Sequence, residues 1–371
     1  MADDFILSAC KYCQHEFRVP SKLAGKQVNC PSCQRQILIA AAAAKPAEDK
    51  LVGKEVGGCR LVRRLGAGAL GVVYEAEQKS VGRKIALKML SSRAASQPEV
   101  VTRFQREAKL SAAIHHENVV GVFDCGLDRG VHFLVMEYID GNTLAGLTED
   151  AGRLDWKTAA GYVKQVAQAL EYVHGKDIIH RDIKPANILV GTDGVAKLAD
   201  LGLAKQIDTS DAAGLTMQGM ALGSPAYMPP EQIRNARDAG RTADIYSLGA
   251  SFYQMLSGKL PFEGKNSTEV MTKVLRETPI PLTTAVPDLP KNVSQLVERM
   301  MDKDPTKRPK DATALIAEID ALEKKPATVK ARRAATGSVS KKSGSNWLII
   351  AVIAFAVAAV VAGVIVMWPK H

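Results

Sequence analysis

The sequence predicts an α+β chain whose main part has two unequal lobes, a small, mostly β lobe followed by a larger helical lobe. From Leu61 onwards, short apolar and β-branched runs follow one another, interrupted by one helical stretch. Beyond Asn142, apolar residues recur at helical spacing instead. A Cys-rich segment precedes these lobes and a long apolar run follows them, so the 371 residues should fold as more than one unit.

Changes in composition set the expected boundaries. Residues 5–39 form a Cys-rich module, 40–55 a linker of small and charged residues, and 56–322 the two-lobed domain. The basic segment 323–346 has little to bury, and the apolar run 347–368 follows it.

Apolar patterning also places individual elements within the two lobes. In the small lobe we expect strands over 71–76, 84–90 and 131–138, and one helix over 98–114. In the larger lobe we expect helices over 156–174, 243–257, 293–301 and 312–322.

The net charge of +10 is concentrated in one part of the chain. Residues 51–323 hold 34 basic and 34 acidic residues, whereas 324–345 hold seven basic residues and no acids. The excess therefore lies beside the apolar run, where membrane phospholipid is the expected counter-charge. General nucleic-acid binding by the two-lobed domain is not expected.

A glycine-rich loop opens the two-lobed domain. Gly66, Gly68 and Gly71 carry no Cβ, so the backbone amides here can approach a phosphate closely. The alternative is a dinucleotide-binding turn, which needs a helix directly after the loop and an acidic residue about 20 positions further on. Because a second strand is predicted after this loop, a nucleoside triphosphate is favoured.

Two charged residues match the needs of bound phosphates. Lys88 lies towards the end of the next predicted strand, where its ammonium could neutralise phosphates held under the loop. Glu107 lies within the predicted helix 98–114 and offers a carboxylate that would hold this lysine in place. Each residue alone would be an ordinary solvated side chain. Together with the loop, they predict an ion pair between Lys88 and Glu107 that controls activity.

The most specific segment runs from His180 to Asn187. It places a carboxylate (Asp182), an ammonium (Lys184) and the Asn187 amide within eight residues. Phosphoryl transfer requires a group that aims a hydroxyl, a metal ligand and a positive charge near the γ-phosphate, and these side chains match those tasks. Asp200, thirteen residues further on, adds an oxygen ligand for Mg²⁺.

Together these residues resemble the eukaryotic-like serine/threonine protein kinases, especially their bacterial branch, over roughly residues 56–322. The resemblance implies the bilobal protein-kinase fold, ATP with Mg²⁺ or Mn²⁺, and phosphate transfer to Ser/Thr hydroxyls of protein substrates. It assigns catalytic roles to Asp182, Lys184 and Lys88, and metal binding to Asn187 and Asp200. The nucleotide contacts that it implies are Leu65, Gly66, Gly68, Gly71, Val73, Ala86, Lys88, Glu107, Met136, Glu137, Ile139, Asn187 and Asp200.

The resemblance extends to residues outside the nucleotide site. Glu231, in a segment that resembles the substrate-docking region, should pair with Arg308, and Asp244 should brace the catalytic loop. One departure from the family pattern is Leu201, where phenylalanine is usual, but this change removes no required functional group.

Arg181, next to Asp182, is a cation that could form an ion pair with a phosphate group on a nearby loop. Addition of that phosphate would then order the loop. The available hydroxyls are those of Thr209, Ser210 and Thr216. We therefore expect autophosphorylation in this segment, with Thr216 slightly preferred.

Four cysteines of the N-terminal module form two Cys-x-x-Cys pairs, Cys10 with Cys13 and Cys30 with Cys33. The 16 residues between the pairs match a tetrahedral Zn²⁺ site with four thiolates, and the module resembles a zinc ribbon. A segment of this size cannot stabilise itself by burial alone, so zinc would supply much of its folding free energy. A redox role is the alternative, but no thioredoxin-like pattern surrounds these cysteines.

The apolar run 347–368 contains 22 residues without a charge and, as a helix, would extend over about 33 Å, enough to cross a bilayer. Trp347 and Trp368 suit the two interfaces, and the preceding basic residues predict a cytoplasmic N-terminal side. We therefore expect a single-pass protein of the cell membrane; a buried core helix is the alternative. Ala354, Ala358 and Ala362 recur every four residues, which leaves a homodimer as an open expectation.

Two other classes of function compete with an active kinase. A catalytically silent kinase fold that serves as a scaffold is disfavoured by the presence of Lys88, Asp182, Asn187 and Asp200. A zinc-ribbon nucleic-acid binder is disfavoured because residues 1–50 hold seven basic and five acidic residues, a small excess.

Overall fold

The computed structural model describes residues 5–10, 15–20, 23, 26–38, 49–68, 70–201 and 224–323. No helix within these ranges is long and apolar enough to cross a membrane. Several predictions fall outside them: those for the basic segment from residue 324, the apolar run 347–368, Cys13, Thr209, Ser210 and Thr216.

Two antiparallel hairpins make up the N-terminal module. Strand β1 (Phe5–Ala9) pairs with β2 (Glu16–Pro20), and β3 (Gln27–Asn29) pairs with β4 (Gln36–Leu38). The core of the module is small: among its buried residues are Val19, Ile37, Cys10 and Cys30.

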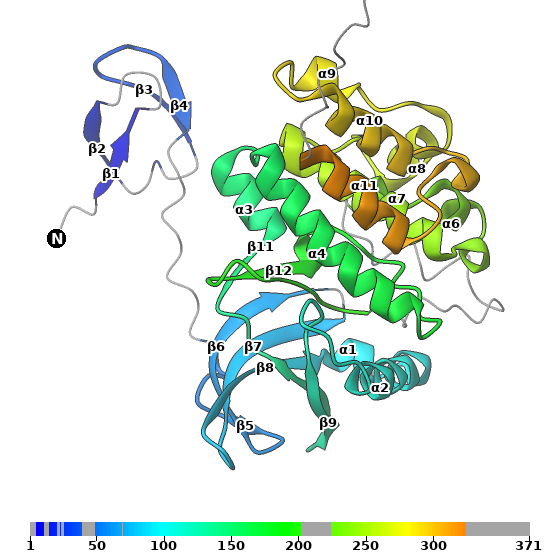
Figure 1. Cartoon of the computed structure of the whole chain (residues 1–371). Coiled ribbons are helices and arrows are strands. Elements are labelled where there is room, and N and C mark those ends of the chain that lie inside the picture. The colour runs from blue at the N-terminus through cyan, green and yellow to red at the C-terminus, as the bar shows by residue number, and fades with distance from the viewer. Residues whose placement is uncertain are drawn as a thin grey trace, which may run out of the picture. The chain divides into compact units, whose positions relative to one another are not determined.

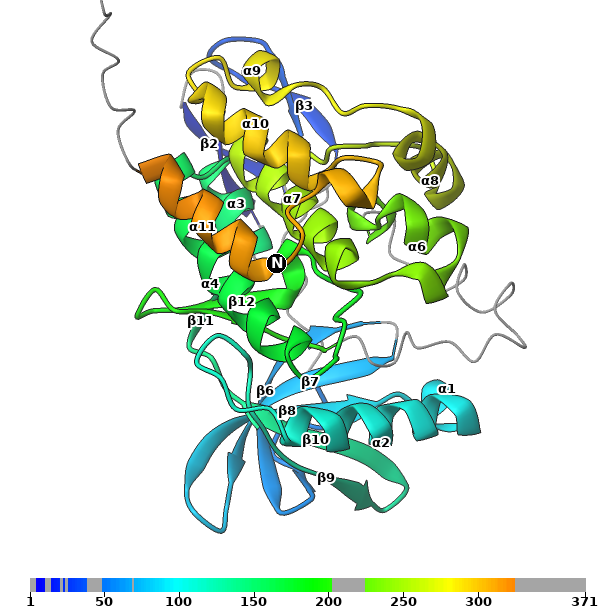
Figure 2. The ribbon, with the colours of Figure 1, turned by 45° about the vertical axis from the view of Figure 1, so that its right-hand side comes forward.

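A six-stranded antiparallel sheet forms the small lobe, in the order β5-β6-β7-β8-β10-β9. Its strands are β5 (Glu55–Val56), β6 (Cys59–Ala67), β7 (Gly71–Gln78), β8 (Arg83–Leu90), β9 (Val122–Asp128) and β10 (Val131–Glu137). Helices α1 (Ser92–Ala95) and α2 (Pro98–Ala112) lie beside this sheet (Figures 1 and 2). Proline begins α2 because its fixed φ suits the first helical position.

Alternation of side chains along the strands separates the two faces of this sheet. Tyr74, Leu87 and Val135 are buried together in the core on one face. Val73 and Ala86, their neighbours in sequence, point to the other face and line the cavity described below. The alternation of side chains along these strands therefore places one set of residues in the core and the other set at the cavity.

The larger lobe begins with a three-stranded antiparallel sheet of β11 (Gly141–Thr143), β12 (Ile188–Gly191) and β13 (Ala196–Leu198). Its helices are α3 (Leu144–Ala151), α4 (Trp156–His174), α6 (Pro230–Arg234), α7 (Arg241–Ser257), α8 (Ser267–Arg276), α9 (Leu282–Ala285), α10 (Lys291–Met300) and α11 (Ala312–Glu323).

Helix α7 runs through the core of the larger lobe, and Tyr246 and Phe252 on it are completely buried. Helices α4 and α10 pack against α7, and α11 lies along α4, as both views of the ribbon show. The loop that follows α4 therefore has a rigid support.

The predicted helices are found close to their expected bounds, and α4 has the predicted ends. The sheet β11–β13 is a departure, because this part of the chain was expected to be helical. Its strands are three or four residues long, too short for an alternating pattern to be read from sequence.

Candidate active site

The glycine-rich loop joins β6 to β7 as a hairpin. The Gly68 amide donates to the Gly71 carbonyl oxygen (2.8 Å), and the Gly71 amide donates to the Gly68 carbonyl oxygen (3.3 Å). A Cβ at Gly71 would lie 1.8 Å from the Met89 carbonyl oxygen, so the close approach of β7 to β8 requires glycine here. A Cβ at Gly66 or Gly68 would meet nothing within 4 Å, which leaves space for a ligand. The strand after the loop excludes a dinucleotide-binding turn.

Residues of both lobes line a cavity of about 440 Å³. This volume suits a ligand the size of a nucleotide. The cavity brings together nine of the predicted nucleotide contacts: Leu65, Gly66, Val73, Ala86, Met136, Glu137, Ile139, Asn187 and Asp200. The other predicted contacts, Gly68, Gly71, Lys88 and Glu107, do not line it.

Other lining residues were not predicted. Val120, Leu189 and Ala199 extend the apolar wall, and Arg63 contributes a polar group. Tyr138 lies between two predicted contacts, Glu137 and Ile139, and lines the cavity with them. A signal was available for two of them. Leu189 follows Asn187 by two residues at the start of a strand, and Ala199 directly precedes Asp200, so the neighbourhood of the metal ligands could have identified both.

The Lys88 ammonium lies 2.7 Å from Asp200 Oδ1. Burial by itself lowers the pKa of Lys88, but the carboxylates of Asp200 and Glu107 outweigh burial and raise that pKa above its ordinary value. The predicted ion pair between Lys88 and Glu107 is not formed. Two carboxylates compete for one ammonium, and in this structure Asp200 makes the direct contact.

Glu107 is a buried carboxyl group, 8% exposed, on α2. Within the described part of the chain it has no ion-pair partner. Burial raises the pKa of Glu107 to about 7; the Lys88 ammonium opposes this shift, and the charges of Asp200 and Asp182 add to it. The residue predicted to hold Lys88 therefore changes its charge near neutral pH.

Asp182, Lys184 and Asn187 converge in the loop that follows α4. The Asp182 Oδ2 atom accepts from Lys184 Nζ (3.1 Å) and from Asn187 Nδ2 (3.1 Å). The Asn187 amide also donates to the Asp182 carbonyl oxygen (2.8 Å). A carboxylate held in this way between a cation and an amide is suited to orient a hydroxyl and accept its proton.

Asp244, on α7, is completely buried and holds the backbone of this loop. Its Oδ2 accepts from the His180 amide and lies near His174 Nε2, and its Oδ1 accepts from the Arg181 amide, each at 2.8 Å. Arg181 has a φ of +63°, a left-handed conformation that strains a residue with a side chain. The bonds to Asp244 stabilise this conformation, which confirms the predicted bracing role.

The His180 side chain links the loop to the residue before Asp200. Its Nδ1 accepts from the Asp182 amide (3.2 Å), so Nε2 carries the proton and donates to the Ala199 carbonyl oxygen (3.0 Å). Complete burial lowers the pKa of His180, which favours this neutral form. The two acidic residues of the site, Asp182 and Asp200, are thereby positioned relative to each other.

Arg308 and Glu231 form the predicted ion pair. The Arg308 guanidinium donates from Nη1 to Glu231 Oε1 (2.6 Å) and from Nη2 to Oε2 (2.9 Å). Both residues are buried, and Arg308 also donates to the carbonyl oxygens of Asp302 (2.8 Å) and Thr242 (2.9 Å). This pair joins the first turn of α6 to the loop before α11, within the helical lobe.

Asn187 and Asp200, the predicted Mg²⁺ ligands, both line the cavity. Because the Asn187 amide nitrogen donates to Asp182, its carbonyl oxygen is left for a metal ion. Asp200 contacts Lys88 through Oδ1, and its Oδ2 remains. Oxygen donors of this kind suit Mg²⁺, so the residues fit the ion.

In the N-terminal module, three sulfur atoms converge. The Sγ atoms of Cys10, Cys30 and Cys33 all lie within 4.8 Å of one another, and those of Cys10 and Cys33 are 3.6 Å apart. A zinc ion with Zn–S distances of about 2.3 Å would hold neighbouring sulfurs roughly 3.8 Å apart. These three residues therefore fit a thiolate zinc site; the predicted fourth ligand, Cys13, lies outside the described residues.

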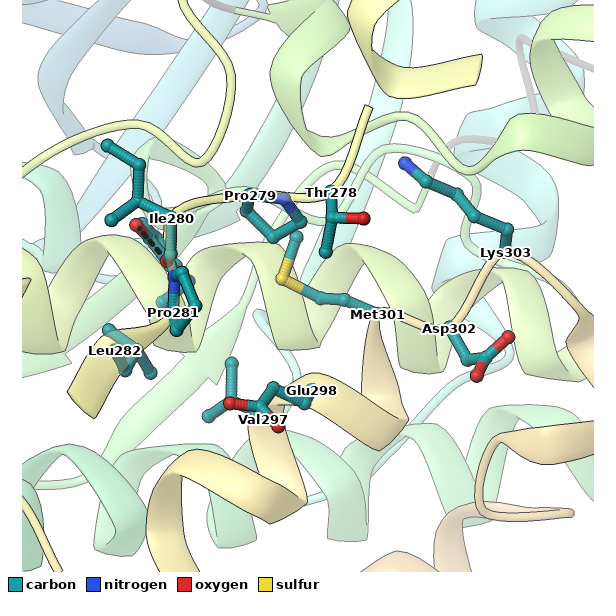
Figure 3. A pocket seen from close by; sticks show the side chains of 11 residues that line it. Thr278, Pro279, Ile280, Pro281, Leu282, Val297, Glu298, Met301, Asp302 and Lys303 are labelled. Atoms are coloured by element: carbon teal, nitrogen blue, oxygen red, sulfur yellow. Dashed lines mark hydrogen bonds between the residues drawn. The ribbon is translucent and has the colours of Figure 1, made fainter. Parts of the chain in front are cut away.

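A second cavity, of about 370 Å³, lies in the helical lobe. Figure 3 shows the segment 278–282 on one side of it and Val297, Glu298 and Met301 on the other. The Tyr253 hydroxyl donates to the Ile280 carbonyl oxygen (2.9 Å) in its wall. No predicted catalytic or nucleotide-binding residue lines this cavity, so the chemistry is assigned to the first one.

Comparisons with known proteins agree with this geometry. A family model described as "Protein kinase domain" matches residues 59–318. The serine/threonine-protein kinase PknA of Mycobacterium tuberculosis is 38% identical over 257 residues, which cover 68% of this chain and 58% of PknA. The serine/threonine-protein kinase pkn3 of Myxococcus xanthus is 36% identical over 288 residues, which cover 75% of this chain and 52% of pkn3.

A probable serine/threonine-protein kinase of Clostridium perfringens is 35% identical over 277 residues, which cover 74% of this chain and 40% of that protein. The match thus spans between 40% and 58% of the length of these curated relatives. Among solved structures, a doubly substituted PknI kinase domain of M. tuberculosis has a TM-score of 0.59 and 26% identity, and the match covers 73% of this chain and 97% of that one.

Proposed function

Because this chain belongs to the protein kinase domain family, we propose that it transfers the γ-phosphate of ATP to serine or threonine hydroxyls of proteins. One observation carries the proposal. Asp182, Lys184 and Asn187 form a hydrogen-bonded group, and Asn187 also lines a nucleotide-sized cavity together with Asp200. Relatives named serine/threonine-protein kinases support the choice of substrate hydroxyl.

Each residue of the group has a separate task in this reaction. Asp182 orients the substrate hydroxyl and accepts its proton, while Lys184, held at Asp182, carries positive charge toward the transferred phosphate. The Lys88 ammonium neutralises the nucleotide phosphates from the small lobe. A magnesium ion, when bound by Asn187 and Asp200, would offset the negative charge of the phosphates.

The test is transfer of labelled γ-phosphate to a generic basic protein. We expect transfer by the wild-type chain and a loss of roughly 10²- to 10⁴-fold in Asp182→Asn, since that is the usual contribution of a general base. Asp288→Asn, at an exposed position in the helical lobe, is the matched control and should keep full activity. Absence of transfer by the wild-type chain with ATP and Mg²⁺ would favour the silent scaffold instead.

We also propose autophosphorylation at Thr209, Ser210 or Thr216. Arg181 supports this proposal. In the part of the chain that the structure describes, its Nε has no hydrogen-bond partner although it is buried, and its Nη2 reaches only the Ala239 carbonyl oxygen at 3.5 Å. A phosphate would satisfy this cation. Unchanged activity in a variant with all three hydroxyl residues replaced by alanine would count against the proposal.

A structural zinc ion in the N-terminal module is a further proposal. The convergence of the Cys10, Cys30 and Cys33 sulfurs supports it, as does the Cys13 spacing in the sequence. With four thiolates the site would be closed to substrate, so its role would be to stabilise the module rather than to catalyse a reaction.

Finally, we propose that the chain is anchored in the cell membrane by residues 347–368, with the kinase domain in the cytoplasm. The uncharged length of this run and the seven basic residues before it support the proposal. The full chain should be extracted from membranes by detergent and not by high salt. A chain ending at residue 323 should be recovered in the soluble fraction. Recovery of the full and the shortened chain in the same fraction would refute the anchor.

A further inference from the structure

Four charged or polar side chains form a cluster beside the nucleotide cavity: Arg63, Glu75, Lys84 and Tyr138. We propose that Glu75 is a positioning residue for ATP binding, which acts through the other three to hold the segment after β10 against the β6–β7 hairpin. The inference rests on the proposed use of ATP, and it concerns binding of the nucleotide rather than transfer of its phosphate.

Two ion pairs of this cluster meet at the Glu75 carboxylate, and two further contacts join the same cations to Tyr138. Its Oε2 lies 2.7 Å from Arg63 Nε, and its Oε1 lies 3.3 Å from Lys84 Nζ. The Arg63 guanidinium also donates from Nη2 to the Tyr138 hydroxyl (3.0 Å). The Lys84 ammonium lies 4.8 Å from the centre of the Tyr138 ring, a cation–π contact. Tyr138, which directly follows β10, is thus held by both cations.

Strand register places this cluster on the nucleotide side of the sheet. Glu75 lies opposite Arg63 on β6 and opposite Ala86 on β8. Because side chains alternate along a strand, Glu75 faces the same way as Val73, and both Val73 and Ala86 line the cavity. Arg63 and Tyr138 line the cavity themselves. Glu75 therefore lies beside the residues that form the cavity wall, on the same face of the sheet.

Burial shows which member of the cluster organises the others. The Glu75 side chain is 9% exposed, whereas those of Arg63 and Lys84 are 59% and 56% exposed. A buried carboxylate requires compensating charges, while exposed cations on a sheet surface have no such need. Burial alone would raise the pKa of Glu75, but Lys84 and Arg63 outweigh it and lower that pKa, so the carboxylate is charged at neutral pH.

Loss of this charge has a specific consequence. The Arg63 guanidinium would be free to leave the cavity wall, and the Tyr138 hydroxyl would lose the donor that Glu75 holds in place. The wall near the segment after β10 would loosen, which weakens ATP binding. Asp182, Lys184 and Asn187 lie in the helical lobe and are untouched, so the chemical step should proceed as before once ATP is bound.

The test compares Glu75→Gln with Glu77→Gln in the full chain. Glu77 lies two residues along the same strand, so its side chain leaves the same face, but it pairs with Arg60 and does not line the cavity. We expect Glu75→Gln to raise KM for ATP about fivefold, with kcat and KM for the protein substrate within about twofold of the wild type. Glu77→Gln should leave all three unchanged.

Two further measurements keep the inference open to refutation. Calorimetric titration should show that Glu75→Gln binds ATP more weakly than the wild type. This measurement tests the inference even if the chain transfers no phosphate. If Glu75→Gln does not fold, Arg63→Gln and Tyr138→Phe, at more exposed positions, should each weaken ATP binding. Lowered thermal stability with unchanged ATP affinity would show that the cluster only stabilises the sheet, and a fall in kcat at unchanged KM would equally overturn the inference.

Discussion

Lys88 Nζ lies 2.7 Å from Asp200 Oδ1, so the β8 ammonium that we predicted for the nucleotide site contacts one of the two predicted metal ligands. Because this ammonium carries positive charge toward the phosphates, Lys88→Met should lower phosphate transfer by roughly 10²- to 10³-fold. The measurement is kcat/KM for ATP with a generic basic substrate. Lys79→Met, which breaks an exposed pair with Glu55, is the control, and an equal effect of both substitutions would contradict the assigned role.

Glu107 should make the stability of the kinase domain depend on pH. Burial raises its pKa from 4.5 to about 7, so the folded chain binds this proton more tightly than the unfolded chain does. The contribution of Glu107 to the free energy of unfolding is therefore full below pH 4.5 and declines as pH rises toward about 7. Relative to the wild type, Glu107→Gln should be more stable at pH 8 than at pH 5.

Urea unfolding at the two pH values measures this difference. Glu99→Gln, at an exposed position in the first turn of α2, is the matched control and should show the same offset from the wild type at both pH values. If Glu107→Gln also shows a constant offset, the raised pKa of Glu107 is refuted.

The buried pair Arg308–Glu231 should contribute far more to stability than an exposed pair in the same lobe. Glu231→Gln leaves a buried guanidinium without its counter-charge and should lower the free energy of unfolding by about 3–5 kcal/mol. Glu318→Gln, which breaks an exposed pair with Arg299, should lower it by less than about 1 kcal/mol. Equal losses in urea unfolding would show that the burial of Arg308 has no energetic role.

The N-terminal module should contain about one zinc ion per chain. Cys30→Ser, which removes one of the three converging thiols, should greatly reduce the zinc content measured by elemental analysis. Cys125→Ser, at an exposed cysteine of β9, should leave it unchanged. Zinc-free protein with a disulfide within either Cys-x-x-Cys motif would support the redox alternative.

The parts of the site that depend on local sequence could be predicted from the amino-acid sequence alone. The loop at Gly66–Gly71 is predictable because its three glycines, which let backbone amides approach a phosphate, lie close together in the sequence, and the Asp182 group because its three side chains lie within six residues of one another. The bracing residue Asp244 and the pair Arg308–Glu231 were predicted by family resemblance, since their contacts span 63 to 77 residues and leave no local pattern.

Two kinds of contact could not be predicted from local sequence: an ion pair for which two carboxylates compete, and contacts that depend on how the strands are paired. The choice of Lys88 between Glu107 and Asp200 depends on relative distances across two lobes, which sequence spacing does not determine. Arg63 lines the cavity because the register between β6 and β7 brings it there, and it belongs to no motif. Tyr138 lies there because it directly follows β10, between the predicted contacts Glu137 and Ile139. The short strands β11–β13 have too few residues for a period of two to be recognised.

The dependence of the catalytic loop on α7 limits how such proteins can be recombined. The backbone amides of His180 and Arg181 are held by a carboxylate 64 and 63 residues further along the chain. A chimaera that exchanges the loop alone transfers its side chains without the residue that shapes them. A graft of the loop between two relatives therefore requires a carboxylate at the position of Asp244 in the recipient helix, and otherwise the helix has to be exchanged with the loop.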